Sequence, residues 1–162
     1  MDCLKFHINF LPILSYTTIS KLASNENDSI FLILTKYFES GSLENQIISK
    51  SLTPTEKSIT IFGIAAAIFF LHSKDLFHGH LYPSNILFTE QKEPRICDYS
   101  LFLLHPHDNL KIKEINKSPF LSPEQLLESK VNAKTDVFSF GKILLYILTD
   151  NSSIKQTNLN DF

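Results

Sequence analysis

Two side chains with oxygen donors stand beside two short apolar runs near the middle of the chain. Asn85 comes just before Ile86-Leu87-Phe88, and Asp98 comes just after Ile96-Cys97, with a polar turn between the two runs. This order predicts a β-hairpin in which each polar residue lies at the end of a strand. Amide and carboxylate oxygens suit Mg²⁺, which takes a few side-chain ligands and keeps water and phosphate for the rest. The alternative is that both residues only cap turns.

Two histidines, His78 and His80, precede this hairpin in a His-x-His arrangement. Together with His72 or Asp98 they could hold a metal ion, because neutral imidazole is a common metal ligand. The alternative interpretation is that His78 packs in the core and has a structural role. A lone His-x-His pair is a weak motif, so the spacing alone does not choose between the two.

The bulk composition is that of an ordinary globular domain. The chain has 162 residues, of which 43% are hydrophobic and 20% charged, enough for one core. Its net charge is −2 and it has no basic block, so we expect no nucleic-acid partner. Cys3 and Cys97 lie far apart, which indicates neither a disulfide framework nor a zinc ribbon and favours a reducing compartment.

Two apolar stretches were tested as membrane or targeting segments. The run from Ile59 to Leu71 is shorter than the roughly 20 apolar residues that span a bilayer. The run from Phe6 to Tyr16 is interrupted by polar residues and by Pro12, and no small-residue cleavage site follows it. We therefore expect a cytoplasmic protein without a membrane partner.

The first third of the chain predicts two strands and a short helix. Residues 10–18 and 29–35 are apolar, β-branched and aromatic runs separated by a polar segment, which is typical of an antiparallel pair. Such a ribbon alone would be marginally stable. A linker follows, and Ser42 is placed to cap a helix that continues through Ser49, with Glu44 in its first turn.

Residues 53–56, Thr-Pro-Thr-Glu, are the strongest local signal for a helix start. Thr53 can be the N-cap, Pro54 suits the first helical position and Glu56 can complete a capping box. The helix should continue to about Ser73. It is apolar nearly all round, which predicts a helix surrounded by protein.

The second half of the chain predicts one more core helix. Thr135 is expected to cap it, and its body over residues 136–148 has almost no polar face. Ser122 followed by Pro123 predicts a shorter helix before it. The remaining segments, residues 101–117 and 149–162, are expected to be an irregular loop and a polar tail.

Several motifs of the chain, taken in order, resemble those of the protein kinases. Residues 78–85, His-Gly-His-Leu-Tyr-Pro-Ser-Asn, resemble the catalytic loop, and Asp98-Tyr99-Ser100 resembles the Asp-Phe-Gly metal motif. Residues 122–124, Ser-Pro-Glu, resemble Ala-Pro-Glu, and residues 136–141, Asp-Val-Phe-Ser-Phe-Gly, resemble the start of the central helix of the large lobe. The shared order is more specific than any single match.

The resemblance implies an α+β, protein-kinase-like fold with a mostly helical large lobe and a remnant of the small-lobe sheet. It divides the chain into small-lobe strands (1–35), a hinge (36–41), a partial large lobe (42–149) and a polar tail (150–162). It also implies that Asp136 holds the backbone of the catalytic loop.

The resemblance further implies ATP and Mg²⁺ as cofactors. Thr35 would be the gatekeeper of the adenine site, Tyr37 and Phe38 would belong to the hinge, and Leu87 would also contact the nucleotide. Asn85 and Asp98 would be the metal ligands. These assignments rest on the position of each residue within the family's motifs.

The departures from the family pattern concern the residues closest to the chemistry. His80 stands at the position of the proton-accepting Asp, and Tyr82 stands at the position of the Lys that faces the phosphate. Gly79 replaces the Arg that pairs with a phosphorylated activation loop. Only nine residues precede Phe10, so we expect neither a Gly-rich loop nor the strand with the phosphate-binding Lys upstream of it.

These departures predict a truncated pseudokinase that serves as a binding or scaffold module for a protein partner in signalling. One alternative is a divergent ATP-dependent kinase that phosphorylates Ser or Thr and uses His80 as its base. Another is a non-functional kinase fragment, because unfilled core faces and an exposed strand edge would leave such a chain without a stable fold.

Overall fold

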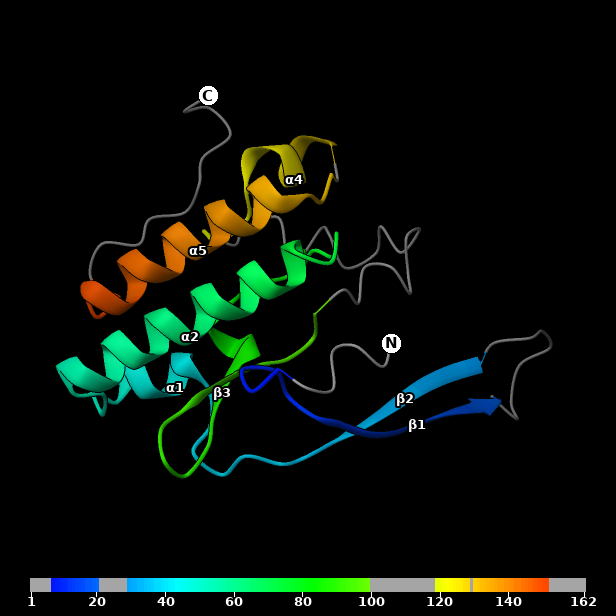
Figure 1. Cartoon of the computed structure of the whole chain (residues 1–162), viewed down its shortest axis with the longest axis horizontal. Helices are drawn as coiled ribbons and strands as arrows, with labels where there is room; N and C mark the ends of the chain where they lie inside the picture. Colours follow the sequence, from blue (N-terminus) through cyan, green and yellow to red (C-terminus); the bar gives the residue numbers. More distant parts are fainter. Residues whose placement is uncertain (1–6, 21–28, 100–118, 129, 152–162) are drawn as a thin grey trace.

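The computed structural model describes residues 7–20, 29–99, 119–128 and 130–151. Its elements form an α+β arrangement in which two long helices lie side by side over a short β-hairpin (Figure 1). In chain order these are β1 (Ile13–Ser20), β2 (Ser29–Thr35), α1 (Leu43–Ile48), α2 (Pro54–His72), the 3₁₀ turn η2 (Pro83–Asn85), β3 (Ile86–Phe88), β4 (Pro94–Ile96), α4 (Pro123–Glu128) and α5 (Ala133–Leu148).

Capping side chains fix where the helices begin. At α2 the hydroxyl of Thr53 accepts the backbone N–H of Glu56, whose carboxylate accepts the N–H of Thr53 in return. Ser42 and Asn45 make the same reciprocal pair at α1. Both helix starts are confirmed by these bonds.

The cap of α5 differs from the expected one. The side chain of Asn132 accepts the backbone N–H groups of Lys134 and Thr135, so α5 begins at Ala133. The prediction that Thr135 is the N-cap was wrong. Thr135 lies inside the first turn, where its hydroxyl accepts the N–H of Asn132 and completes the capping box.

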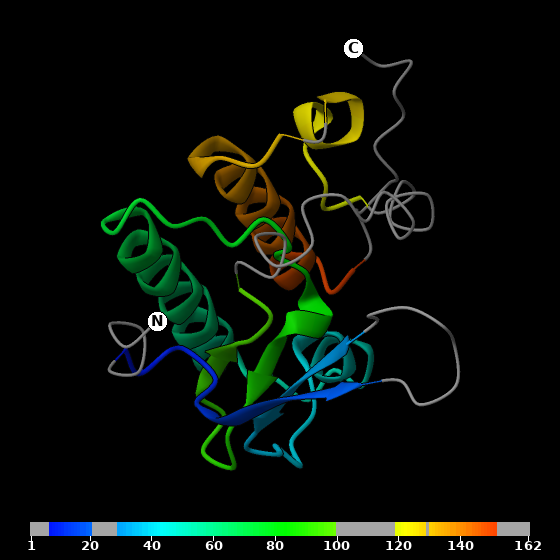
Figure 2. The same ribbon diagram turned by 90° about the vertical axis from the view of Figure 1, so that its right-hand side faces the viewer.

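The core lies between α2, α5 and the β3–β4 hairpin. Ile64 and Leu71 of α2, Ile143 of α5, and Ile86 and Ile96 of the hairpin are fully buried there. Figure 2 shows α2 and α5 still adjacent when the molecule is turned by 90°. Burial of these side chains is the main favourable contribution to the stability of this part of the chain.

The two long helices are buried on one side only, contrary to the expectation that protein surrounds them. The buried residues of α2 recur at helical spacing, whereas Phe62 is 81% exposed and Phe69 is 76% exposed on the same helix. Val137 and Leu148 of α5 are also exposed. An apolar sequence all round a helix indicates how much surface could be buried, but only the tertiary contacts decide how much is buried.

The apolar run within α2 was expected to be too short to span a bilayer. The whole helix, however, is long and apolar enough to cross a membrane by length and composition alone. Its packing against α5 and β4 in the core is typical of a core helix of a globular domain.

The N-terminal strands form a separate ribbon. β1 pairs with β2 in antiparallel register, from Ile13 opposite Thr35 to Ser20 opposite Ser29, with an irregularity between Ile13 and Ser15. The expected antiparallel pair is thus confirmed, although its first strand begins at Ile13. Phe10, three residues before β1, instead forms a bridge to Ile96 of β4 and anchors the ribbon to the core. The predictions for the loop 101–117 and for the tail beyond residue 151 lie outside the described residues.

Candidate functional site

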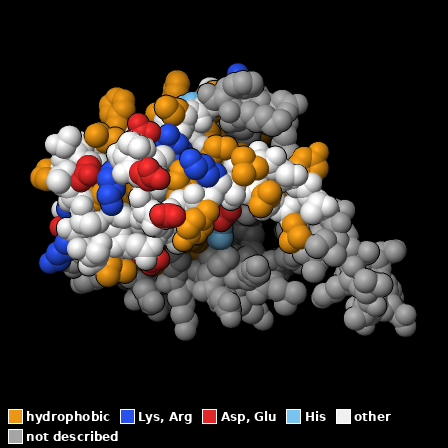
Figure 3. All heavy atoms as spheres, turned by 90° about the horizontal axis from the view of Figure 1, so that it is seen from below, with side chains coloured by type: hydrophobic (Ala, Val, Ile, Leu, Met, Phe, Trp, Pro, Cys, Tyr) orange, Lys and Arg blue, Asp and Glu red, His pale blue; other side chains and the backbone are white. Residues whose placement is uncertain are grey.

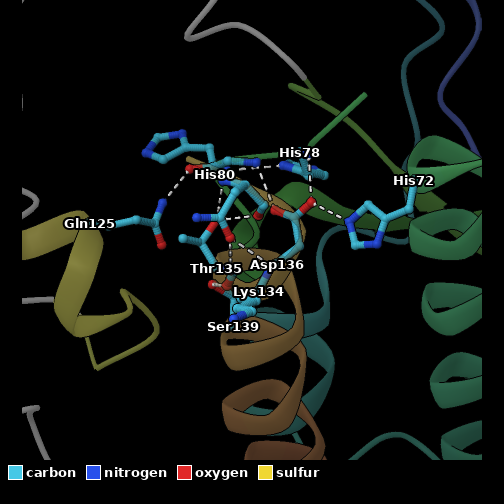
Figure 4. Close-up of polar contacts among 10 residues, drawn as sticks. His72, His78, His80, Gln125, Lys134, Thr135, Asp136 and Ser139 are labelled. Carbon is cyan, nitrogen blue, oxygen red and sulfur yellow. Dashed lines mark hydrogen bonds and ion pairs between the residues drawn. The ribbon is translucent and has the colours of Figure 1, made fainter. Parts of the chain in front are cut away.

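One buried carboxylate, Asp136 in the first turn of α5, organises the loop before the hairpin (Figure 4). Its Oδ2 accepts the backbone N–H of His78 at 2.8 Å, and its Oδ1 accepts the N–H of Gly79 at 2.8 Å. Nε2 of His72, at the end of α2, lies 2.9 Å from Oδ2 and donates to it. Hydrogen bonds to a charged acceptor are stronger than neutral ones. The implied role of Asp136 as the holder of this loop is therefore confirmed.

A second anchor of the loop comes from α4. The side-chain amide of Gln125 donates from Nε2 to the backbone carbonyl of Gly79 at 2.9 Å, so both polar backbone groups of Gly79 are bonded. Gly79 has a φ of +72°, in the left-handed region that suits glycine. The sequence analysis did not predict this contact, because nothing in a sequence pattern places α4 beside the loop.

His78 is a buried, neutral side chain. Its ring is fully buried, and Nδ1 accepts the backbone N–H of His80 at 3.2 Å. Burial lowers the pKa of His78 to about 4, although the Asp136 carboxylate acts in the opposite direction. The structural interpretation of His78 fits this environment better than the metal interpretation. In the described part of the chain, no group of three His, Cys, Asp or Glu side chains is placed to hold a metal ion.

The two residues at the altered catalytic positions pack against each other. The rings of His80 and Tyr82 lie edge to face, with centroids 4.7 Å apart and an interplanar angle of 88°. The ring centroids of Tyr82 and Phe120 lie 6.0 Å apart, and those of Phe120 and Tyr146 of α5 lie 5.7 Å apart. Edge-to-face pairs of this kind are favourable beyond the area they bury. Four rings thus connect the loop to the core helix.

The two candidate metal ligands lie at the open end of the hairpin. The backbone carbonyl of Asn85, before β3, accepts the N–H of Cys97, after β4, at 2.9 Å. The Asn85 side chain donates from Nδ2 to the carbonyl of His80 at 2.9 Å, and it therefore also fixes the loop. Asp98 follows Cys97 and is exposed, with a φ of +59°. The structure brings the two backbone positions together, as the hairpin predicted.

The residues predicted to meet adenine are distributed over two neighbouring segments. Leu87 lies in the middle of β3 and forms a bridge to Ser42, just after the predicted hinge. Phe38 is half-buried with the Lys36 ammonium 5.7 Å from its ring centroid. Thr35 ends β2 and is half-buried, whereas Tyr37 is 82% exposed. Leu87 thus lies beside the end of the predicted hinge, whereas the side chain of Tyr37 faces solvent.

Comparison with known sequences assigns the family. The model of the family described as protein tyrosine and serine/threonine kinase matches residues 7–161, nearly the whole chain. The chain belongs to the protein kinase family. The α+β arrangement described above is accordingly a kinase-like domain, and the family uses ATP and Mg²⁺.

Individual relatives of this kinase-like chain are distant. It is 26% identical to the probable serine/threonine-protein kinase PBL4 of Arabidopsis thaliana, over 98% of this chain and 39% of the relative. It is 37% identical to pollen receptor-like kinase 1 and 32% identical to U-box domain-containing protein 33, both of Arabidopsis thaliana, over 73% and 76% of this chain. It spans 19% and 16% of those two relatives. The chain therefore spans less than two fifths of the length of each of these curated relatives.

Proposed function

We propose that this kinase-like domain does not transfer phosphate and works as a binding or scaffold module for a protein partner. The observation that carries the proposal is the His80–Tyr82 pair. In the catalytic loop of a protein kinase, an Asp carboxylate accepts the proton of the substrate hydroxyl. Here an imidazole stands at that position, with its ring packed edge to face against a tyrosine ring.

The charge of the loop also argues against phosphoryl transfer. Tyr82 places a neutral ring where serine/threonine kinases have a Lys, so no side chain at that position can stabilise the charge of the transferring phosphate. The backbone N–H and the carbonyl of His80 are both bonded, to His78 Nδ1 and to Asn85 Nδ2. Moving the His80 ring toward a substrate would therefore require these bonds or the ring contact with Tyr82 to rearrange.

The retained framework supports a binding role. Asp136 and Gln125 hold the backbone of the loop and His72 bonds Asp136, although the side chains at positions 80 and 82 differ from the family pattern. A preformed rigid loop on a folded domain is a suitable surface for another protein, because little conformational entropy is lost on binding. As part of the same proposal, we assign the module to the cytoplasm and the partner to the class of proteins.

A divergent kinase is the second candidate, favoured by a different observation. Asn85 and Asp98, which offer an amide and a carboxylate oxygen, are still present on the adjoining ends of β3 and β4. If both bound Mg²⁺ with ATP, His80 could act as an unconventional base toward a Ser or Thr hydroxyl.

A phosphotransfer assay separates the two candidates. The full chain is incubated with Mg-ATP and a Ser/Thr peptide pool, beside its Asp98→Ala variant. We expect the same background signal from both proteins, because no carboxylate is available at position 80. Turnover by the original chain that disappears in the Asp98→Ala variant would overturn the proposal and establish the divergent kinase. Thermal-shift titration of ATP with and without Mg²⁺ reports nucleotide binding independently of turnover.

A further inference from the structure

The short helix α4 lies beside the catalytic loop and is attached to it by one buried side chain. Gln125, in the first turn of α4, is 8% exposed, and its Nε2 donates to the carbonyl of Gly79 at 2.9 Å. Figure 4 shows the Gln125 side chain extending from α4 toward the loop at His80. Gly79 has no side chain, so its backbone is what the loop offers to α4 at this position.

The amide oxygen of Gln125 also fixes the start of α4. Ser122 is fully buried, and both its backbone N–H and its hydroxyl donate to Gln125 Oε1 at 3.3 Å. The backbone N–H of Gln125 donates in return to Ser122 Oγ at 3.3 Å. This is a reciprocal cap, in which each side chain bonds the backbone of the other residue. One side chain therefore connects the helix start at Ser122 with the loop at Gly79.

Two further contacts attach the residues before α4 to the core. The hydroxyl of Ser139 in α5 donates to the carbonyl of Phe120 at 2.8 Å, and Ser139 is buried. The ring of Phe120 packs edge to face against the rings of Tyr82 in the loop and Tyr146 in α5. The segment is therefore held at both ends, at Phe120 and at Gln125.

Each of these contacts joins neutral groups, namely amides, carbonyls, hydroxyls and aromatic rings. Charged side chains pair at other positions, such as Lys57 with Asp150 and Arg95 with Glu93. On the face seen in Figure 3, charged side chains of both signs gather on the left. Attraction between a phosphate and a basic group is screened by salt, whereas contacts between neutral buried groups do not depend on that attraction.

From these contacts we infer that residues 120–125 form a clamp on the catalytic loop that holds without a phosphate group, with Gln125 as its positioning residue. Ser122 lies inside this clamp, so another kinase could reach its hydroxyl only after the clamp had opened. The segment is thus a permanently ordered part of the domain and not a phosphorylation switch. The inference concerns how the segment is held, so it stands whether or not the domain transfers phosphate.

Hydrogen exchange measured by mass spectrometry tests the clamp on the full chain after phosphatase treatment. Residues 119–128 should exchange more slowly than in the urea-unfolded chain, because the N–H groups of Gln125 and Leu126 are bonded to Ser122. The exchange should be the same at about 0.05 M and about 0.5 M salt, and in a Ser118→Glu variant whose carboxylate stands in for a phosphate. Exchange as fast as in the unfolded chain, or protection that depends on salt or on Ser118→Glu, would overturn the inference.

Two substitutions of Gln125 test its role as the positioning residue. Gln125→Glu keeps an acceptor for Ser122 and removes the donor to Gly79, and Gln125→Met removes both without adding a charge. In each variant, exchange in residues 119–128 and in residues 76–82 of the loop should become roughly tenfold faster or more, because a buried carbonyl loses its donor.

Leu127→Glu is the matched control. It adds the same charge to the same helix at a site that is 65% exposed, and it should exchange like the original chain. Exchange along α2 reports the overall fold in the same samples and should stay unchanged in all variants. Unchanged exchange in both Gln125 variants, or equal loosening by Leu127→Glu, would overturn the positioning role. Equally faster exchange along α2 would show that Gln125 supports the whole fold, which would also overturn the inference of a local clamp.

Discussion

At the scale of single residues, the domain keeps the bonds that shape a catalytic loop and changes the groups that would act in it. Asp136 accepts hydrogen bonds from two backbone N–H groups and from His72, and the Asn85 side chain donates to the carbonyl of His80. His80 and Tyr82 pack as rings in place of a carboxylate and an ammonium. The bonds that hold the loop backbone are thus present, although the side chains at these two positions differ from the family pattern.

The buried ring of His78 should make the domain less stable in mild acid. Burial lowers the pKa of His78 from 6.5 to about 4, with His80 acting in the same direction and Asp136 against both. The unfolded chain therefore binds one more proton than the folded chain between these values. The contribution of His78 to the free energy of unfolding is therefore most favourable above about pH 6.5. It falls by up to about 3 kcal/mol as the pH falls toward about 4.

This pH dependence can be checked by urea unfolding at about pH 7 and about pH 5. The original chain should lose more stability between the two than a His78→Gln variant, whose amide does not titrate. His7→Gln is the control, because His7 is only half-buried and should contribute less. Equal pH dependence of the original chain and the His78→Gln variant would show that His78 is not the group responsible.

At the scale of elements, side chains at helix starts decide where each helix begins. α1, α2 and α5 each have a reciprocal pair in which an N-cap side chain and the side chain three residues later bond each other's backbone N–H. At α5 this pair also sets the orientation of the first turn, which contains Asp136. The cap and the loop anchor are therefore parts of one local arrangement.

Removing the α5 cap should cost measurable stability. Asn132→Ala deprives the N–H groups of Lys134 and Thr135 of their acceptor, and we expect a loss of about 1 kcal/mol in the free energy of unfolding. Asn132→Asp is the control, since a carboxylate accepts the same bonds and should leave stability nearly unchanged. Chemical denaturation followed by circular dichroism measures both. An Asn132→Ala variant as stable as the original chain would contradict the assignment of Asn132 as the N-cap of α5.

At the level of the whole molecule, the described residues combine one small core with exposed apolar surface. The core joins α2, α5 and the β3–β4 hairpin, while the outer faces of both helices are exposed, as are Leu14, Tyr16, Leu32 and Leu34 of the ribbon. The chain spans 39% or less of the relatives described above. Whether this core suffices for a stable fold distinguishes a binding module from a non-functional fragment.

Two substitutions in one helix test the core. Ile64→Ala empties a fully buried site of α2 and should cost about 3 kcal/mol, whereas Phe62→Ala at a site 81% exposed should change stability by less than about 0.5 kcal/mol. Thermal unfolding of the original chain should be a single cooperative transition that shifts only with the first variant. A broad, non-cooperative melt that is equal in all three proteins would favour the non-functional fragment.

Features that depend on neighbours along the chain could be predicted from the residue order. The caps at Ser42 and Thr53 bond groups within one turn of the helix, so their spacing is visible in the sequence. The hairpin around Asn85 and Asp98 follows from a short polar turn between two apolar runs. The order of the motifs carried the family resemblance, which the family match over residues 7–161 confirmed.

Features that join distant segments became visible in the folded chain and could not be predicted from the sequence. Which face of α2 is buried depends on where α5 and β4 pack, and an almost uniformly apolar helix gives no periodicity from which to choose. The contacts of Gln125 with Gly79 and of His72 with Asp136 connect positions 46 and 64 residues apart. The physical reason is that such contacts depend on the packing of whole elements, whereas residue types and spacing describe only local preferences.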